Sequence, residues 1–93
     1  ITKNFRCLRG EIDLIMRDGN DLVFVEVRSR ARSDYVDAID SVTTNKQKKI
    51  LSTAIYFLQK KNWLDKINCR FDVVGISHQN LEWIKDAFTA DIL

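Results

Sequence analysis

A tight-turn sequence between two apolar segments is the feature that most constrains this chain. Residues 11–17 (EIDLIMR) and 22–28 (LVFVEVR) are rich in β-branched and other apolar side chains, and the four residues DGND separate them. Gly19 and Asn20 both tolerate the positive φ that a two-residue hairpin turn requires. The pattern therefore predicts a β-hairpin in which Asp18 pairs with Asp21.

The predicted hairpin has one wholly apolar face and one mixed face. The apolar face alternates along both strands and comprises Ile12, Leu14, Met16, Val23, Val25 and Val27. We expect this face to turn toward the core. The mixed face carries Ile15, Leu22 and Phe24 beside its charged residues. We therefore expect a helix or loop to cover part of it and to leave its acidic residues in a cleft.

Two acidic residues converge on the mixed face in this register. Asp13 lies directly opposite Glu26, and Glu11 lies opposite Arg28. Like charges so placed destabilise a sheet unless something compensates, and Mg²⁺ binds a couple of carboxylates together with water and phosphate oxygens. Arg28 would lie on the same face, about 6–7 Å beyond Glu26. The alternative is a solvated polar face, in which Glu11 and Arg28 form an ordinary ion pair.

The rest of the chain predicts one helix and two further strands. Apolar residues recur at helical spacing over residues 45–61, and Thr44 with Gln47 fits a capping box at the start. Residues 71–76 and 81–88 are typical of strands, whereas residues 30–40 have the composition of a loop. The order β-β-loop-α-β-β predicts a single α/β domain over residues 1–93, built on a mixed sheet.

Composition excludes several classes of protein. A chain of 93 residues is long enough for one domain. Cys7 and Cys69 are far apart in the sequence, so neither a disulfide framework nor a zinc knuckle is supported. The apolar runs are too short for a transmembrane helix, and the N-terminus does not resemble a signal peptide. We expect a cytoplasmic protein that makes no contact with membranes.

The positive charge is concentrated in one segment. The net charge of the chain is only +2, but residues 28–49 contain six basic and three acidic residues. The basic residues are Arg28, Arg30, Arg32, Lys46, Lys48 and Lys49. A local basic patch favours contact with a polyanion such as nucleic acid. A solvated charged face is the alternative.

Five runs in this sequence resemble one known family. They are NFRCLRGEIDLI at 4–15, VFVEVRSR at 23–30, SVTTNKQ at 41–47, RFDVV at 70–74 and WIKDAF at 83–88. In this order they resemble the UPF0102 (YraN-like) family of small bacterial proteins. These are regarded as predicted endonucleases, distantly similar to archaeal Holliday junction resolvases. The resemblance covers nearly the whole chain.

The resemblance implies a restriction-endonuclease-like fold with a PD-(D/E)xK-type site. Asp13 would be the first acid and Glu26 the second, together holding Mg²⁺ or Mn²⁺, and Arg28 would stand at the position of the basic residue. Gln47 resembles the helix glutamine of related nucleases, which helps to hold the substrate or the metal's water shell; completing the capping box is the alternative. DNA, possibly branched, would be the substrate, and a homodimer would match the symmetry of a junction.

This chain departs from the family pattern in two ways. Many members have lysine where this chain has Arg28, and arginine cannot act as a general base because it stays protonated. Lys46 is a candidate for a lysine that has migrated to the helix; a solvated lysine at the helix end is the alternative. Family members also carry an N-terminal helix with a glutamate, and we expect this chain to lack that helix and therefore part of the site.

Three functions follow from these observations. The first is a metal-dependent endonuclease, in which Arg28, Lys46 and Gln47 contact phosphate or position water. The remaining basic residues, Arg30, Arg32, Lys48 and Lys49, would then follow the DNA backbone. The second is a catalytically inactive nucleic-acid-binding module of the same fold, and the third is a structural or protein-interaction domain. Asp72 is expected to make a structural ion pair or hydrogen bond. Trp63 and Trp83 would either pack in the core or an interface, or stack on bases.

Overall fold

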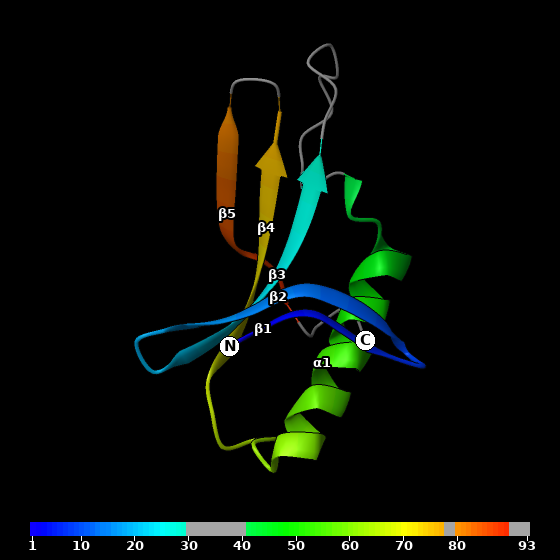
Figure 1. Ribbon diagram of the computed structural model, residues 1–93, viewed down its shortest axis with the longest axis vertical. Helices are drawn as coiled ribbons and strands as arrows, with labels where there is room; N and C mark the ends of the chain where they lie inside the picture. The colour runs from blue at the N-terminus through cyan, green and yellow to red at the C-terminus, as the bar shows by residue number, and fades with distance from the viewer. Residues whose placement is uncertain (30–40, 78–79, 90–93) are drawn as a thin grey trace.

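The computed structural model describes residues 1–29, 41–77 and 80–89. Its elements are β1 (Thr2–Cys7), β2 (Gly10–Asp18), β3 (Asp21–Ser29), α1 (Thr44–Lys61), β4 (Cys69–Ile76) and β5 (Leu81–Phe88) (Figure 1). The strands form one mixed sheet in the order β1-β2-β3-β4-β5, in which only β3 and β4 are parallel. The predicted α/β class and mixed sheet are confirmed.

Strand β1 was absent from the predicted order, which is corrected to β-β-β-α-β-β. Its sequence, TKNFRC, alternates weakly, and Asn4 has a φ of 51° instead of an extended value. Pairing with β2 and packing of Phe5 against the helix hold it in the sheet. Residues 2–7 therefore form a strand because of tertiary contacts, which a local sequence pattern does not reveal.

The hairpin between β2 and β3 has the predicted turn and register. Asp18 pairs with Asp21, and the ladder continues in step to Leu14 opposite Val25. Gly19 has a φ of 60°, as a two-residue turn of this kind requires. In Figure 1, β1 and β2 run across the direction of β4 and β5, so the sheet is strongly twisted.

The helix packs on the mixed face of the hairpin, as expected, so the larger core cluster lies on this face. The prediction that the apolar face turns toward the core is confirmed only for the smaller cluster on the other side of the sheet. Ile15, Leu22 and Phe24 are at most 1% exposed. They share one cluster with the buried apolar face of the helix, which comprises Ile50, Leu51, Ala54, Phe57 and Leu58. The bulky aromatic and aliphatic side chains of the mixed face fill the space beneath α1. The smaller valines lie on the opposite face.

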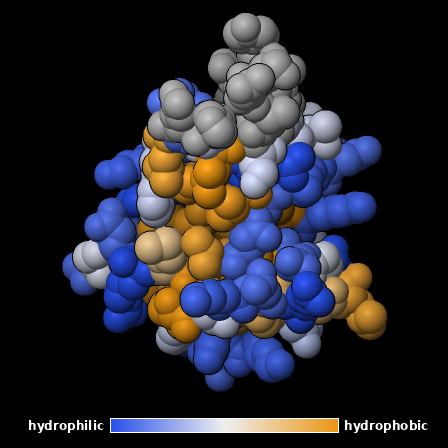
Figure 2. Space-filling model, turned by 45° about the horizontal axis from the view of Figure 1, so that its top comes forward, coloured by the Kyte–Doolittle hydropathy of each residue, from blue (hydrophilic) through white to orange (hydrophobic). Residues whose placement is uncertain are grey.

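The opposite face forms a second, smaller apolar cluster. Its buried members are Val23, Val25 and Val74, with Leu14, Met16 and Val27 packed around them. Trp83 pairs with Val74 across β4 and β5 and is 43% exposed. Ile76 and Leu81, at the ends of the same two strands, are 40% and 64% exposed. Figure 2 shows a hydrophobic area beside the grey atoms in this region.

Strand β2 does not keep strict alternation along its length. Ile12 and Ile15 are three positions apart, yet both belong to the cluster under the helix. The irregularity falls at Asp13, between the pairs of β1 and β2 that join Phe5 to Ile12 and Lys3 to Leu14. Ile12 therefore leaves the apolar face to which strict alternation had assigned it.

The residue that caps the start of helix α1 lies one position before the predicted cap, Thr44. The cap is Thr43, whose side chain accepts a hydrogen bond from the Lys46 amide at 3.3 Å. The predicted capping box of Thr44 and Gln47 is therefore wrong. Asn62 ends the helix in the left-handed conformation with a φ of 60°. The part of the chain that the structure describes contains no helix with both the length and the hydrophobicity of a membrane span.

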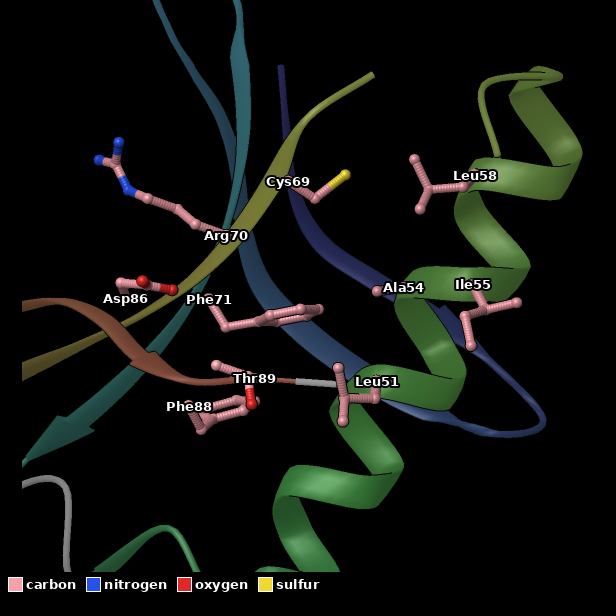
Figure 3. Close-up of a pocket in the computed structure, with 10 residues that line it drawn as sticks. All are labelled: Leu51, Ala54, Ile55, Leu58, Cys69, Arg70, Phe71, Asp86, Phe88 and Thr89. Carbon is pink, nitrogen blue, oxygen red and sulfur yellow. The ribbon is translucent and has the colours of Figure 1, made fainter. Parts of the chain in front are cut away.

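An apolar cavity of about 270 Å³ lies between α1 and the edge of the sheet (Figure 3). Leu51, Ala54 and Leu58 line it from the helix, opposite Phe71 and Phe88. The charged ends of Arg70 and Asp86 point away from the helix in this view. The cavity thus has apolar walls and no inward-pointing charged group among its labelled residues.

Candidate metal and nucleic-acid site

Asp13 and Glu26 come together at the point where the hairpin ladder stops. The regular pairs of β2 and β3 end at Leu14 opposite Val25. One residue further, Oδ2 of Asp13 accepts a hydrogen bond from the Val27 amide at 2.8 Å. Contrary to the prediction, Asp13 therefore does not pair directly with Glu26 in the ladder. Instead, its side chain is hydrogen-bonded to the main chain of β3, which keeps the Asp13 carboxylate beside that strand.

The Glu26 carboxyl group is buried next to another acid. Glu26 is only 5% exposed. Burial, followed by the neighbouring Asp13 carboxyl, raises the pKa of Glu26 above its ordinary value of 4.5, although Lys46 opposes the shift. The close approach of two carboxyl groups that the sequence predicted is therefore present. Such a pair favours either a proton or a cation between its members.

Two cations contact the same oxygen of Glu26. Nζ of Lys46 lies 3.1 Å from Oε2, and a guanidinium nitrogen of Arg28 lies 3.4 Å from it. Arg28 also donates from Nε to the Ser41 hydroxyl at 3.1 Å. Lys46 therefore reaches from the first turn of α1 into the group predicted from the hairpin. The sequence did not predict Ser41 as a partner of Arg28. The only feature that could have indicated a role for Ser41 was its place as the first residue of the SVTTNKQ run.

A shallow hollow of about 270 Å³ opens onto this group. It is lined by Gly10, Glu11, Asp13, Glu26, Lys46, Lys49 and Ile50. Both acids thus face a recess with two lysines, as expected for acids left in a cleft. Glu11 forms an ion pair at 2.7 Å with Arg6 of the neighbouring strand β1. The predicted pair of Glu11 with Arg28 is therefore wrong, because β1 was not foreseen.

The other predicted site residues lie outside this hollow or outside the described residues. Gln47 donates from its side-chain nitrogen to the Val42 carbonyl at 2.9 Å, so its amide braces the start of the helix. Lys48 is exposed on α1 and does not line the hollow. Arg30 and Arg32 lie in the range 30–40, outside the described residues.

The donor set of the hollow suits an incompletely coordinated hard cation. Among the described residues, no three His, Cys, Asp or Glu side chains gather into a closed metal cage. Asp13 and Glu26 supply carboxylate oxygens, and Mg²⁺ commonly binds one or two carboxylates while it keeps several waters. The acid pair therefore fits Mg²⁺ or Mn²⁺ with water or phosphate oxygens as the other ligands. It does not fit a structural zinc site.

Asp72 has the structural role that the sequence predicted. It is 0% exposed and accepts hydrogen bonds from Arg70, from Trp83 Nε1 at 2.9 Å and from the Asp86 amide at 2.9 Å. Burial alone would raise the pKa of Asp72, but these donors outweigh burial and hold it below its ordinary value of 3.8. Asp72 therefore ties β4 to β5. Trp63, in contrast, packs against the core beside Phe57.

Comparison with known proteins identifies the relatives of this chain. The model of the "Uncharacterised protein family UPF0102" matches residues 1–76. A UPF0102 protein of Coxiella burnetii (strain RSA 331 / Henzerling II) is 51% identical over 92 residues, which is 98% of this chain and 77% of the relative. A UPF0102 protein of Dechloromonas aromatica (strain RCB) is 52% identical over 91 residues, which is 98% of this chain and 73% of the relative. On these matches, the chain belongs to the UPF0102 family.

Proposed function

We propose that this protein is a metal-dependent endonuclease with a restriction-endonuclease-like fold, acting on structured or branched DNA. The observation that supports the proposal best is the acid pair of half-buried Asp13 and buried Glu26, in a hollow that Lys46 also enters. Two carboxylates and a lysine in one recess are suited to hydrolysis of a phosphodiester assisted by a divalent cation. The predicted homodimer is part of the same proposal.

Asp13 and Glu26 would hold Mg²⁺ or Mn²⁺. A bound cation of this kind stabilises charge on a scissile phosphate and lowers the pKa of a water molecule. The Asp13 carboxylate is oriented by the Val27 amide, and Glu26 is held on its strand between Arg28 and Lys46. Both acids are therefore preorganised by their own neighbours.

In this proposal, Arg28 and Lys46 together take the role of the single lysine that many family members have. Arg28 stays protonated, so in this proposal it binds the phosphate and stabilises its negative charge. The Lys46 side chain is the more exposed of the two, at 42% against 25% for Arg28, and can contact water in the hollow. Lys46 would orient the attacking water and contribute positive charge beside it. Lys49, on the same wall, would contact the DNA backbone.

A second function, a nucleic-acid-binding module without catalysis, is favoured by one specific observation. The Glu26 carboxylate is already neutralised by Lys46 and Arg28 within the chain. An acid that already has two internal cations beside it has less need of a metal ion. In this alternative the two cations and Lys49 would bind phosphate while the acids hold the cations in place.

Cleavage of branched DNA distinguishes the two functions. A four-way junction and a linear duplex are incubated with the purified protein in Mg²⁺, and with the Asp13→Asn, Glu26→Gln and Glu82→Gln variants. Glu82 is an exposed acid on β5 outside the hollow, so its variant is the matched control. We expect Mg²⁺-dependent cleavage that only the first two variants lose. Cleavage that survives in those variants refutes the proposal, and salt-sensitive binding without cleavage supports the second function.

A further inference from the structure

A second hollow, of about 310 Å³, lies on the sheet face that α1 does not cover. Met16 and Val23 line it, and both belong to the smaller apolar cluster of that face. Trp83 also lines it, and this residue is 43% exposed. Part of the lining of the hollow is therefore apolar and includes a partly exposed aromatic residue.

The Trp83 ring is fixed in orientation by a buried acid. Its Nε1 donates to Oδ2 of Asp72 at 2.9 Å, and Asp72 is 0% exposed. Asp72 is itself held by Arg70 and by the Asp86 amide. A ring held in this way loses little conformational entropy when a flat ligand stacks on its exposed part.

Two cations beside this ring have no acidic partner among the described residues. Arg17 and Lys85 line the hollow and are exposed, and neither takes part in an ion pair within that part of the chain. The acid in the lining, Asp18, is matched by Arg70 at 2.9 Å. The charge that the hollow offers to a ligand is therefore positive.

We propose that this hollow binds an unpaired nucleotide of a nucleic acid, with its base stacked on Trp83 and its phosphates attracted to Arg17 and Lys85. An aromatic platform flanked by cations is the arrangement that binds single-stranded nucleic acid without sequence preference. An apolar protein partner would use the ring and the apolar lining but would leave the two cations unexplained. The proposal does not depend on catalysis by Asp13 and Glu26.

Fluorescence of Trp83 tests the proposal directly. Trp63 and Trp83 are the two tryptophans of the chain, so Trp63→Phe leaves Trp83 as the reporter. The additional Glu26→Gln change and the absence of divalent cations prevent cleavage. The protein is titrated with an oligothymidylate of about ten nucleotides, a length within the usual site size of single-strand binders. We expect quenching of Trp83 that saturates, with an affinity that falls as salt rises.

Charge variants separate specific binding from general attraction. Arg17→Ala and Lys85→Ala should each weaken the affinity several-fold and reduce the salt slope by about one unit. Lys66→Ala removes an equal charge from an exposed turn outside the hollow, and it should leave the affinity and the salt slope unchanged. Because these variants keep Trp83 and Asp72, they test the site without disturbing its support. Absence of quenching, or equal weakening by all three variants, overturns the proposal.

An abasic strand of the same length provides the second arm. It retains the phosphates, so we expect it to bind more weakly by about tenfold and to leave Trp83 fluorescence unquenched. Quenching by the abasic strand equal to that by oligothymidylate contradicts stacking. The titrations with oligothymidylate and with the abasic strand do not depend on whether Asp13→Asn abolishes junction cleavage. Failure of this proposal and failure of the nuclease proposal are therefore distinguishable.

Discussion

Nζ of Lys46 lies 3.1 Å from Oε2 of Glu26 and joins the start of the helix to the acidic end of the hairpin. The contact gives the buried carboxylate an internal counterion on the wall of the hollow that also contains Asp13. In the proposed nuclease, Lys46 is therefore close enough to act on water or phosphate bound to a cation that the two acids would hold. The same ammonium group would repel a divalent cation.

Replacing Lys46 by methionine separates these two effects. The Lys46→Met variant should cleave a junction about 10²-fold more slowly, because it loses the charge that orients water and phosphate. It should bind Mn²⁺ at least as tightly as the unmodified chain at a pH well above the pKa of Glu26, because a competing positive charge is gone. Single-turnover cleavage and calorimetric titration with Mn²⁺ measure the two quantities.

Lys48→Met is the matched control for this variant. Lys48 is an exposed lysine of the same helix turn that does not line the hollow. Its removal should change cleavage by no more than a few-fold at low salt. Equal loss in both variants would mean that Lys46 contributes only general attraction to DNA.

The raised pKa of Glu26 predicts that this acid costs stability at neutral pH. Between the ordinary value of 4.5 and the higher value in the folded protein, the folded state binds more protons than the unfolded state. Stability due to Glu26 therefore falls as pH rises through that window, and the cost is fully present above it. Glu26→Gln should raise the free energy of unfolding at pH 7 by about 0.5–2 kcal/mol.

Urea denaturation at neutral pH and below the ordinary pKa of Glu26 measures this difference. The gain from Glu26→Gln should shrink at the lower pH, where the carboxyl is protonated in both states. Glu82→Gln, which changes an exposed acid, should alter stability by less than about 0.5 kcal/mol at either pH. A Glu26→Gln protein that is less stable at neutral pH would show that the pairs with Lys46 and Arg28 outweigh burial.

Gly10 is predicted to be required for the approach of β2 to the helix. A Cβ at Gly10 would lie 2.9 Å from Oγ1 of Thr53, and the φ of Gly10 is +153°. Thr53 is 0% exposed, and its hydroxyl donates to the Lys49 carbonyl at 2.8 Å, so it cannot easily move away. Gly10→Ala should therefore lower the free energy of unfolding by about 2–3 kcal/mol.

Gly19→Ala provides a control with backbone strain but no clash. Gly19 has a φ of +60°, and a Cβ there meets nothing within 4 Å. The Gly19→Ala substitution should lower the free energy of unfolding by about 1 kcal/mol, because of the left-handed conformation alone. Adding Thr53→Ala to Gly10→Ala should recover part of the lost free energy of unfolding. If the losses from the two substitutions simply add in the double mutant, the proposed contact is contradicted.

Local rules predicted the hairpin well because its register depends on adjacent residues. Gly19 permits the turn, and the pairing from Asp18 with Asp21 to Leu14 with Val25 follows from it. The choice of one core face was incomplete because both faces of the hairpin are apolar enough to be buried, and the larger cluster lies on the mixed face. Alternation indicates which side chains lie together, but it does not specify which face the helix covers; in the structure Phe24 packs beneath α1 and the valines lie on the other face.

The approach of the two acids was predictable from the sequence, but the geometry around them was not. An ideal ladder placed Asp13 opposite Glu26, and the two acids do come together in one hollow. The bond from the Val27 amide to Asp13 depends on the irregularity in β2, which no local pattern reports. The approach of Lys46 depends on where the helix docks, and a spacing in the sequence cannot specify that.

Asp72 is predicted to be the main polar contribution to the stability of β4 and β5. Its pKa is held below 3.8, so its contribution is present above that value and is lost as pH falls through the lower value of the folded protein. Asp72→Asn leaves the Arg70, Trp83 and Asp86 donors without their buried charge. It should lower the free energy of unfolding at pH 7 by about 3 kcal/mol in urea denaturation.

Asp65→Asn is the matched control for this variant, because Asp65 is exposed in the turn after α1. It should change stability by less than about 0.5 kcal/mol. An Asp72→Asn protein with the stability of this control would mean that the hydrogen bonds to Asp72 make no net contribution. Trp83 fluorescence, followed in the Trp63→Phe background, would show whether the indole stays in place.

Calorimetric titration of the protein with Mn²⁺ tests the central claim, that Asp13 and Glu26 form a divalent-cation site. We expect one binding site per chain, whose affinity falls at least about tenfold in Asp13→Asn and in Glu26→Gln. The Glu82→Gln variant should retain it. Absence of Mn²⁺ binding, or binding that is equal in the three variants and the unmodified chain, would contradict the claim.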